Sequence, residues 1–181
     1  MKKLLLLSAV ILFCTSCAKS DPISKLPELY SGDITCIATV QALSRPACDY
    51  TVAFSRSGDM DTVELLAPES IAGIKATVEQ GSAGISYEGK YLETLLPYYW
   101  GASPVDALSA IFDSMAAGAP QWQNTQGDSV TCEYRIYSDN ADIRQRVELD
   151  KETLALKSAQ VELDGALIML IELQSVQLYA N

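Results

Sequence analysis

The sequence predicts an α+β protein: an antiparallel β-sheet of about nine to eleven strands that curves into an incomplete barrel, with helices on its concave side. Three observations lead to this prediction. Apolar and polar residues alternate with a period of two from Asp33 almost to the end of the chain. Short turns separate the alternating segments, so neighbouring strands pair antiparallel. One long segment, 103–117, has a helical apolar stripe instead.

The first half of the chain contains six predicted strands. Residues 34–40 place Ile34, Cys36, Ala38 and Val40 on one face, and residues 48–55 resume the same alternation after the turn "SRPA". Further alternating segments cover 63–67 and 74–78. Two shorter strands, "GISYEG" and "KYLETLLP", flank Gly89-Lys90. Together they predict a meander of hairpins.

Two segments predict helix. "APESIAG" has Pro68 at a first helical position and Gly73 just beyond the end, which predicts a single short turn. "ASPVDALSAIFDSMAAG" predicts the main helix, with Ser103 as its cap and Gly118 as its closing residue. Its apolar stripe must pack against the sheet and consists of Val105, Leu108, Ile111, Phe112 and Met115.

Strands return in the second half of the chain. Alternation is clear over 130–136 and 143–149, and a hairpin about Asp164-Gly165 closes the chain. The segment "ALIMLIEL", with Leu167, Met169 and Ile171, is apolar on both faces. It is either a strand that is covered on both sides or a strand that lines an apolar cavity.

The N-terminus has the features of a bacterial lipoprotein signal. A basic start is followed by an apolar run over Leu4–Phe13, which is short of the roughly 20 residues that cross a bilayer, and then by small residues before Cys17. We expect cleavage after residue 16 and acylation of Cys17, for example with palmitate. The alternative is an ordinary signal peptide with a chance cysteine. Residues 17–32 then form the lipidated cysteine and a polar tether, and 33–181 form one domain.

The charge balance excludes some partners. Without Lys2 and Lys3 the mature chain has 11 basic and 23 acidic residues, a net charge of −12. Nucleic acid is therefore excluded as a partner, and so is electrostatic adhesion to anionic headgroups. The expected contact with the membrane is the N-terminal lipid alone, which places the protein outside the cytoplasm on the cell membrane.

The residues for common catalytic chemistry are missing. The chain contains no histidine, which excludes Ser-His-Asp and Cys-His catalysis and the common zinc sites. Carboxylates such as Glu64, Glu79 and Glu162 fall on polar strand faces, where solvated surface is the simpler interpretation. No glycine-rich phosphate loop or calcium loop is present. We therefore expect no catalytic residue, no metal and no cofactor.

Three cysteines of the mature domain are in phase with apolar neighbours. A hairpin turning near residues 44–46 places Cys36 opposite Phe54 and Cys48 opposite Ala42. The two cysteines are then about 20 Å apart at about 3.3 Å per residue, too far for a disulfide. We expect Cys36, Cys48 and Cys132 to be buried, reduced thiols.

Five aromatic residues lie within fourteen positions before the main helix. They are either the mouth of an apolar cleft or a docking patch for a partner, or they are simply packed between sheet and helix. The candidates for the surface are Tyr91, Tyr98, Tyr99 and Trp100.

The order of elements resembles the LolA/LolB-like fold, an incomplete antiparallel barrel whose concave apolar face is plugged by helices. The segments "CDYTVAFSRSGDMDTVELLAPESIAGIKATVEQGSAGISYEGKYLETL" and "SPVDAL" further resemble anchored lipoproteins of clostridial-type bacteria, including the germination lipoprotein (GerS) group. The similarity extends over most of 33–180. It implies a non-catalytic lipoprotein of the cell envelope.

Two functions remain open. The curved sheet holds an acyl chain or another apolar ligand, or the outer surface recruits a protein such as an envelope or spore-cortex enzyme. A third alternative, implied by the fold resemblance, is a lipid or lipoprotein carrier of the LolA/LolB type. If a ligand binds, its contacts are predicted to be Val105, Leu108, Ile111, Phe112, Met115, Leu167, Met169 and Ile171.

Overall fold

The computed structural model describes residues 22–43, 46–79, 82–95, 100–138 and 141–179, and the expected signal peptide and Cys17 lie outside these ranges. The first half holds the helices η2 (Pro22–Lys25) and α2 (Leu26–Tyr30), the strands β1 (Asp33–Ala42), β2 (Cys48–Ser57) and β3 (Met60–Ala67), the turn η3 (Glu69–Ile71), and the strands β4 (Lys75–Glu79), β5 (Ser82–Tyr87) and β6 (Lys90–Leu95). The second half holds α3 (Ala107–Ala117), β7 (Trp122–Gln126), β8 (Ser129–Ser138), β9 (Ala141–Asp150), β10 (Leu156–Leu163) and β11 (Ala166–Tyr179).

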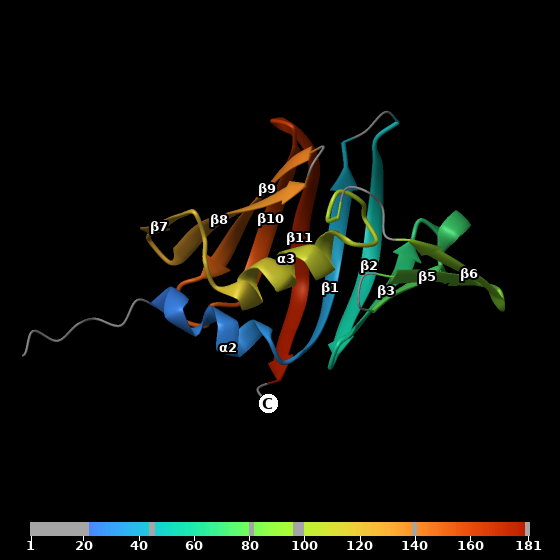
Figure 1. Cartoon of the computed structure of the whole chain (residues 1–181), viewed down its shortest axis with the longest axis horizontal. Helices are drawn as coiled ribbons and strands as arrows, with labels where there is room; N and C mark the ends of the chain where they lie inside the picture. Colours follow the sequence, from blue (N-terminus) through green and yellow to red (C-terminus); the bar gives the residue numbers. More distant parts are fainter. Residues whose placement is uncertain (1–21, 44–45, 80–81, 96–99, 139–140, 180–181) are drawn as a thin grey trace, which may run out of the picture.

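The strands form one open sheet, as the alternation predicts. Its order is β6-β5-β4-β3-β2-β1-β11-β10-β9-β8-β7, and all pairs are antiparallel. The chain starts at the centre with β1, reaches one edge at β6, crosses to the other edge at β7 and returns to the centre at β11 (Figure 1). The crossing carries α3, which therefore lies across the concave face of the sheet.

The sheet bends at irregularities of the ladder. The pairing shifts at Ile37/Ala38 between β1 and β11, and again at Thr51/Val52 and Val161/Glu162. An extra residue on one strand of a pair bends that strand and increases its twist. The result is the curved, unclosed sheet that the sequence predicts.

The first predicted hairpin has the expected register. Cys36 pairs with Phe54 and Ala42 with Cys48. The closing hairpin turns at Asp164 and Gly165, both with positive φ of 52° and 80°, which suits a two-residue turn. Strand "ALIMLIEL" is only partly buried, and that it lines a cavity stays a prediction. Met169 and Ile171 are 1% exposed on the concave face, whereas Leu167 is 41% exposed.

The main helix starts later than its sequence signals predict. The α-helix begins at Ala107 with Asp106 as its N-cap residue. Ser103 does not cap it: the Ser103 backbone N–H donates to the Asp106 carboxylate, and the Ser103 carbonyl accepts from the backbone N–H of Ala107. Gly118 ends the helix with a φ of 67°, as predicted.

Residues 22–30, which the sequence assigns to the polar tether, form helix and belong to the core. Ile23, Leu26 and Tyr30 are spaced three and four apart, so they share one helix face and are 0–5% exposed. The Tyr30 hydroxyl donates to the Leu154 carbonyl at 2.8 Å and accepts from the Leu156 N–H at 2.9 Å. The helical spacing is present in the sequence, but the two prolines and polar neighbours obscure it.

Candidate functional site

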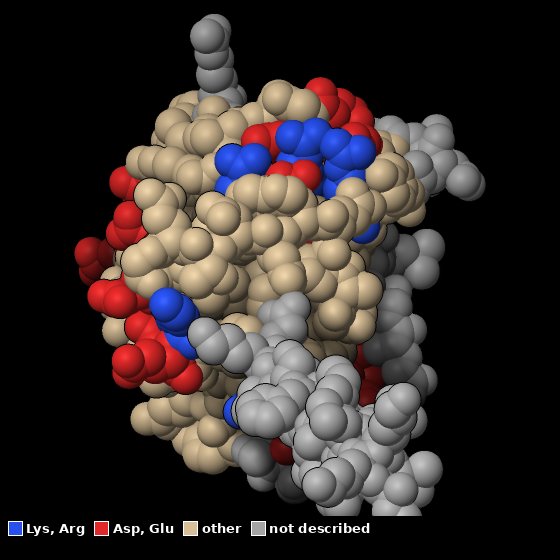
Figure 2. All heavy atoms as spheres, turned by 90° about the vertical axis from the view of Figure 1, so that its left-hand side faces the viewer, with Lys and Arg blue, Asp and Glu red and all other residues tan. Residues whose placement is uncertain are grey.

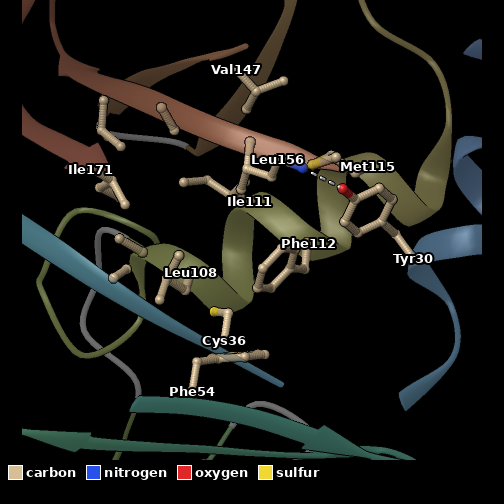
Figure 3. Close-up of a cluster of buried hydrophobic side chains, with 14 of the residues drawn as sticks. Tyr30, Cys36, Phe54, Leu108, Ile111, Phe112, Met115, Val147, Leu156 and Ile171 are labelled. Carbon is tan, nitrogen blue, oxygen red and sulfur yellow. Dashed lines mark hydrogen bonds between the residues drawn. The ribbon is translucent and has the colours of Figure 1, made fainter. Parts of the chain in front are cut away.

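The predicted helix stripe is the centre of the hydrophobic core. Four of its side chains are 0–1% exposed: Leu108, Ile111, Phe112 and Met115. Figure 3 shows these side chains on the helix, among buried side chains from the surrounding strands. The Phe112 ring packs against Tyr30 at a centroid distance of 5.7 Å and against Phe54 at 4.9 Å. These side chains are thus already in contact with side chains of the same chain.

The remaining predicted ligand contacts divide by position. Met169 and Ile171 belong to the same core as the helix stripe, and Val105 packs against it while partly buried. Leu167 lies at the start of β11 and is exposed. The structure thus brings together seven of the eight residues and leaves out Leu167. That these residues bind a ligand stays a prediction.

The core also contains polar atoms. Gln145 on β9 is fully buried, and its carbonyl oxygen accepts from the Ser114 hydroxyl of α3 at 2.8 Å. Within the described part of the chain its amide nitrogen has no hydrogen-bond partner. A buried polar atom without a partner costs about 1–3 kcal/mol, so the Gln145 amide is an unsatisfied polar point in the interior beneath α3.

The segment before α3 closes over this polar point. Gly101 has a φ of +86°, and a Cβ there would lie 2.7 Å from the Ala110 side chain and 3.3 Å from the Gln145 amide nitrogen. Only glycine fits such a close approach. Asp106 is 1% exposed, and burial raises the pKa of its carboxyl above the usual value, opposed by hydrogen bonds from Ser103.

An ion cluster joins α3 to the rim of the sheet. The Arg56 guanidinium of β2 donates two bonds of 2.7 Å to Asp61 of β3 and one of 2.7 Å to Asp113 of α3. Arg56 and Asp61 are nearly buried, at 10% and 7% side-chain exposure, whereas Asp113 is 54% exposed. Sequence analysis did not identify this cluster. The sequence does contain an indication of it, because Arg56 is in phase with Val52 and Phe54, whose side chains point inward from β2.

The predicted surface aromatics lie partly outside the described residues, as Tyr98 and Tyr99 do. Tyr91 on β6 is 69% exposed, and its ring lies across Gly84 on β5, where a Cβ would clash with it. Trp100 is half-buried. Leu92, also on β6, is 64% exposed, so this edge of the sheet presents apolar surface.

A second ion cluster, which sequence analysis missed, lies on the outer face of β8–β10. Arg144 contacts Glu133 at 3.4 Å and Glu162 at 3.2 Å, and Arg146 contacts Glu133 at 3.2 Å. Figure 2, which views the molecule from the β7 side, shows basic and acidic atoms interleaved in one group. Two exposed aromatics accompany the cluster: Trp122 and Tyr137. Trp122 was missed because β7 is exposed at all of its positions and therefore has no alternating pattern.

The thiols are only partly as predicted. Cys36 and Cys132 are buried, but Cys48 at the start of β2 is half-exposed because it lies at the end of its hairpin. None of the three takes part in a disulfide. Burial raises the pKa of Cys36 to about 12, which keeps that thiol protonated.

Among the residues that the structure describes, no group of three or more Cys, Asp or Glu side chains could hold a metal ion. No helix within the same ranges is long and apolar enough to span a bilayer.

No protein-family model and no curated protein matches the chain. Solved structures do match. An uncharacterized conserved protein from Thermus thermophilus is 9% identical, with a TM-score of 0.52 over 88% of this chain and 86% of that chain. A LolA superfamily protein from Nitrosomonas europaea is 9% identical, with a TM-score of 0.43 over 88% and 93% of the two chains.

The structure of the CwlD amidase from Clostridioides difficile in complex with the GerS lipoprotein also matches, at 12% identity and a TM-score of 0.44 over 82% of this chain and 84% of that chain. At such identities the likeness concerns the fold alone. An open eleven-stranded antiparallel sheet with helices on its concave face is the architecture that the sequence resemblance implies. The chain has a LolA-like fold.

Proposed function

We propose that the protein is a non-catalytic, membrane-tethered docking module that binds a protein partner through its outer surface. One observation supports this choice over ligand binding. Four stripe residues on α3 would line a ligand cavity: Leu108, Ile111, Phe112 and Met115. These four are 0–1% exposed and are packed against the protein's own side chains. A close-packed interior of this kind has little room for an acyl chain.

The tether is part of the proposal. We infer that Cys17 is acylated and holds the domain on the outer side of the cell membrane, because two or three acyl chains bind almost irreversibly at about 0.8 kcal/mol per methylene. Cys17→Ala is expected to leave an uncleaved precursor or to release the protein from membranes. Fractionation and migration identical to wild type would contradict the anchor.

Cross-linking in intact cells tests the docking function. Four lysines serve as reporters: Lys75 on β4, Lys90 on β6, and the pair Lys151 and Lys157, which both contact the β7–β8 turn. We expect mass spectrometry of the full-length protein to find repeated cross-links from a subset of these lysines to one other protein. Cross-links only to abundant membrane proteins, in proportion to their abundance, would contradict the proposal.

Binding of an apolar ligand beneath α3 is the second candidate, as a binding module or as a carrier. The Gln145 amide nitrogen, which has no partner among the described residues, favours it, since a ligand's polar group would pair with that nitrogen. In that case a fluorescent fatty acid binds the protein at micromolar strength, and Leu108→Asp abolishes binding while far-UV circular dichroism stays native. The docking proposal expects no saturable binding.

A further inference from the structure

Among the residues that the structure describes, no strand pairs with the second half of β8 on the side away from β9. β7 is the last strand of the sheet and pairs only with the first half of β8, from Gln126↔Ser129 to Trp122↔Glu133. The second half, residues 134–138, pairs with β9 on its inner side. On its other side no strand of the described residues pairs with it, and Figure 1 shows β7 as the short outermost strand.

The backbone of β8 presents hydrogen-bonding groups at this gap. The Glu133 carbonyl points to the β7 side, because it accepts from the Gln121 N–H at 2.8 Å. The N–H and C=O of one residue point the same way in an antiparallel strand and alternate along it. Arg135 and Tyr137 therefore point their N–H and C=O groups into the gap. Among the described residues these groups have no backbone partner on that side.

The side chains beside the gap are suited to binding. Trp122, Arg135 and Tyr137 lie on the outer face of the sheet, since each is in phase with Glu133 in the register. Trp122 is 48% and Tyr137 65% exposed. Aromatic and arginine side chains carry much of the binding free energy in protein interfaces.

Arg135 has a weaker carboxylate contact than its neighbours Arg144 and Arg146 on β9. Its Nη1 donates to the Tyr137 hydroxyl at 3.2 Å, but its carboxylate neighbour Asp142 is 4.0 Å away. Arg144, by contrast, contacts two carboxylates at 3.4 Å or less. An added carboxylate opposite Arg135 would form a charge-assisted hydrogen bond there.

We propose that an extended segment of a second protein, carrying a carboxylate side chain, adds to the sheet as an antiparallel strand along residues 134–138 of β8. Main-chain hydrogen bonds to Arg135 and Tyr137 give the affinity, and a carboxylate opposite Arg135 gives the preference. This inference rests on the proposed docking function and names its surface and the chemistry of its partner.

A second copy of the chain fits this edge less well. The edge is only five residues long, about 17 Å at 3.3 Å per residue. A stable interface between folded proteins buries about 1,200–2,000 Å², which needs a larger contact than this edge alone. Two mature chains with a net charge of −12 each also repel one another. An extended segment needs no large interface. It also does not bring a second charge of −12 to the edge.

Two labelled peptides test the recognition. In the antiparallel register STYVETS places its glutamate opposite Arg135 and its tyrosine opposite Tyr137, and STYVKTS carries the reversed charge. We expect the full-length protein in nanodiscs to bind STYVETS about tenfold more tightly than STYVKTS, measured by fluorescence anisotropy. In Arg135→Glu the preference reverses. Equal binding of both peptides, or binding of neither, would overturn the proposed recognition.

A proline tests the backbone contact. Because the Tyr137 N–H points into the gap, Tyr137→Pro removes a donor without breaking the β8–β9 ladder. We expect it to lose binding about tenfold or more, and Tyr137→Ala, which keeps the donor, to lose less. If the proline variant does not fold, the reversed peptide preference of Arg135→Glu still tests the proposal.

The outcomes separate this inference from the docking function. If a partner is cross-linked equally to wild type and Tyr137→Pro, the β8 edge is excluded while the docking function stands. If no partner is cross-linked to any variant, the docking function itself fails. If wild type dimerises and Tyr137→Pro does not, the occupant is a second copy and the proposal is overturned.

Discussion

Arg56 stands at an inward position of β2 where the preceding positions are apolar. Its guanidinium is tolerated there because Asp61 meets it with two hydrogen bonds and Asp113 with a third. A buried charge that loses its partner is strongly destabilising, whereas an exposed partner contributes little. The two aspartates should therefore differ in their effect on stability.

The first prediction compares these two aspartates. Asp61→Asn is expected to lower the free energy of unfolding by about 3 kcal/mol, because it leaves a nearly buried guanidinium without its main partner. Asp113→Asn, at a half-exposed site, should cost no more than about 1 kcal/mol. Urea denaturation of the two variants measures both. Equal losses would contradict the assignment of Asp61 as the main partner.

The second prediction concerns pH. Burial raises the pKa of Asp106 in the folded protein, so between the unfolded and folded pKa values the folded state binds more protons than the unfolded state. This group's contribution therefore lowers stability as pH rises from about 4 through the raised pKa. Asp106→Asn, which keeps the acceptor for the Ser103 N–H, should lack that decrease. If the wild type and Asp106→Asn show parallel curves of unfolding free energy against pH, this prediction is wrong.

The third prediction concerns thiol reactivity. A reagent such as DTNB should label the half-exposed Cys48 in the native protein, whereas the buried Cys36 and Cys132 should react only after unfolding. Cys48→Ser is the control and should remove all native-state labelling. Rapid labelling of two or more thiols in native protein would show that the core opens.

At the scale of elements, α2 illustrates how a short helix gains stability from tertiary contacts. Five residues are too few for a stable isolated helix, so α2 depends on the burial of Leu26 and Tyr30 and on the two hydrogen bonds of the Tyr30 hydroxyl. Those bonds connect the N-terminal helix to the start of β10. The segment is therefore part of the domain and not a spacer.

The fourth prediction tests this. Tyr30→Phe removes only the hydroxyl and leaves two buried backbone groups without a partner, so it should cost about 1–3 kcal/mol of stability. Glu28→Ala on the exposed side of the same helix should change stability by less than about 0.5 kcal/mol. A neutral Tyr30→Phe, measured by thermal or urea denaturation, would contradict the role of the hydroxyl.

The elements that sequence reasoning could predict are those whose faces differ in burial. The strands β1, β2, β9 and β10 alternate clearly, and the register of the first hairpin follows from its turn. β7 could not be found in this way, because Trp122–Gln126 is exposed at all five positions. Exposure on both faces leaves no alternation in the sequence.

The candidate site shows the same limit. The stripe of α3 was recognisable from its helical spacing, but the sequence could not decide whether the residues that it faces leave space between them. That depends on the volumes of side chains from β1, β2, β8–β11 and α2, which meet only in the folded chain. The Arg56 cluster likewise joins residues 57 positions apart.

At the scale of the whole molecule, the order of the strands explains why α3 lies where it does. Two meanders meet at β1 and β11, and the connection between their outer edges must cross one face of the sheet. Once it crosses the concave face, its apolar stripe and the inward strand residues bury each other. Exposed apolar and aromatic surface remains at the two edges, at Tyr91 and Leu92 and at Trp122 and Tyr137.

Native mass spectrometry of the full-length protein, released gently from detergent micelles, tests most directly whether the interior is occupied by the protein's own side chains. The account predicts the mass of the mature lipidated chain with no additional bound lipid, for wild type and for Leu108→Asp alike. A persistent additional mass of one lipid in wild type, absent from a folded Leu108→Asp variant, would contradict it and favour the ligand-binding function.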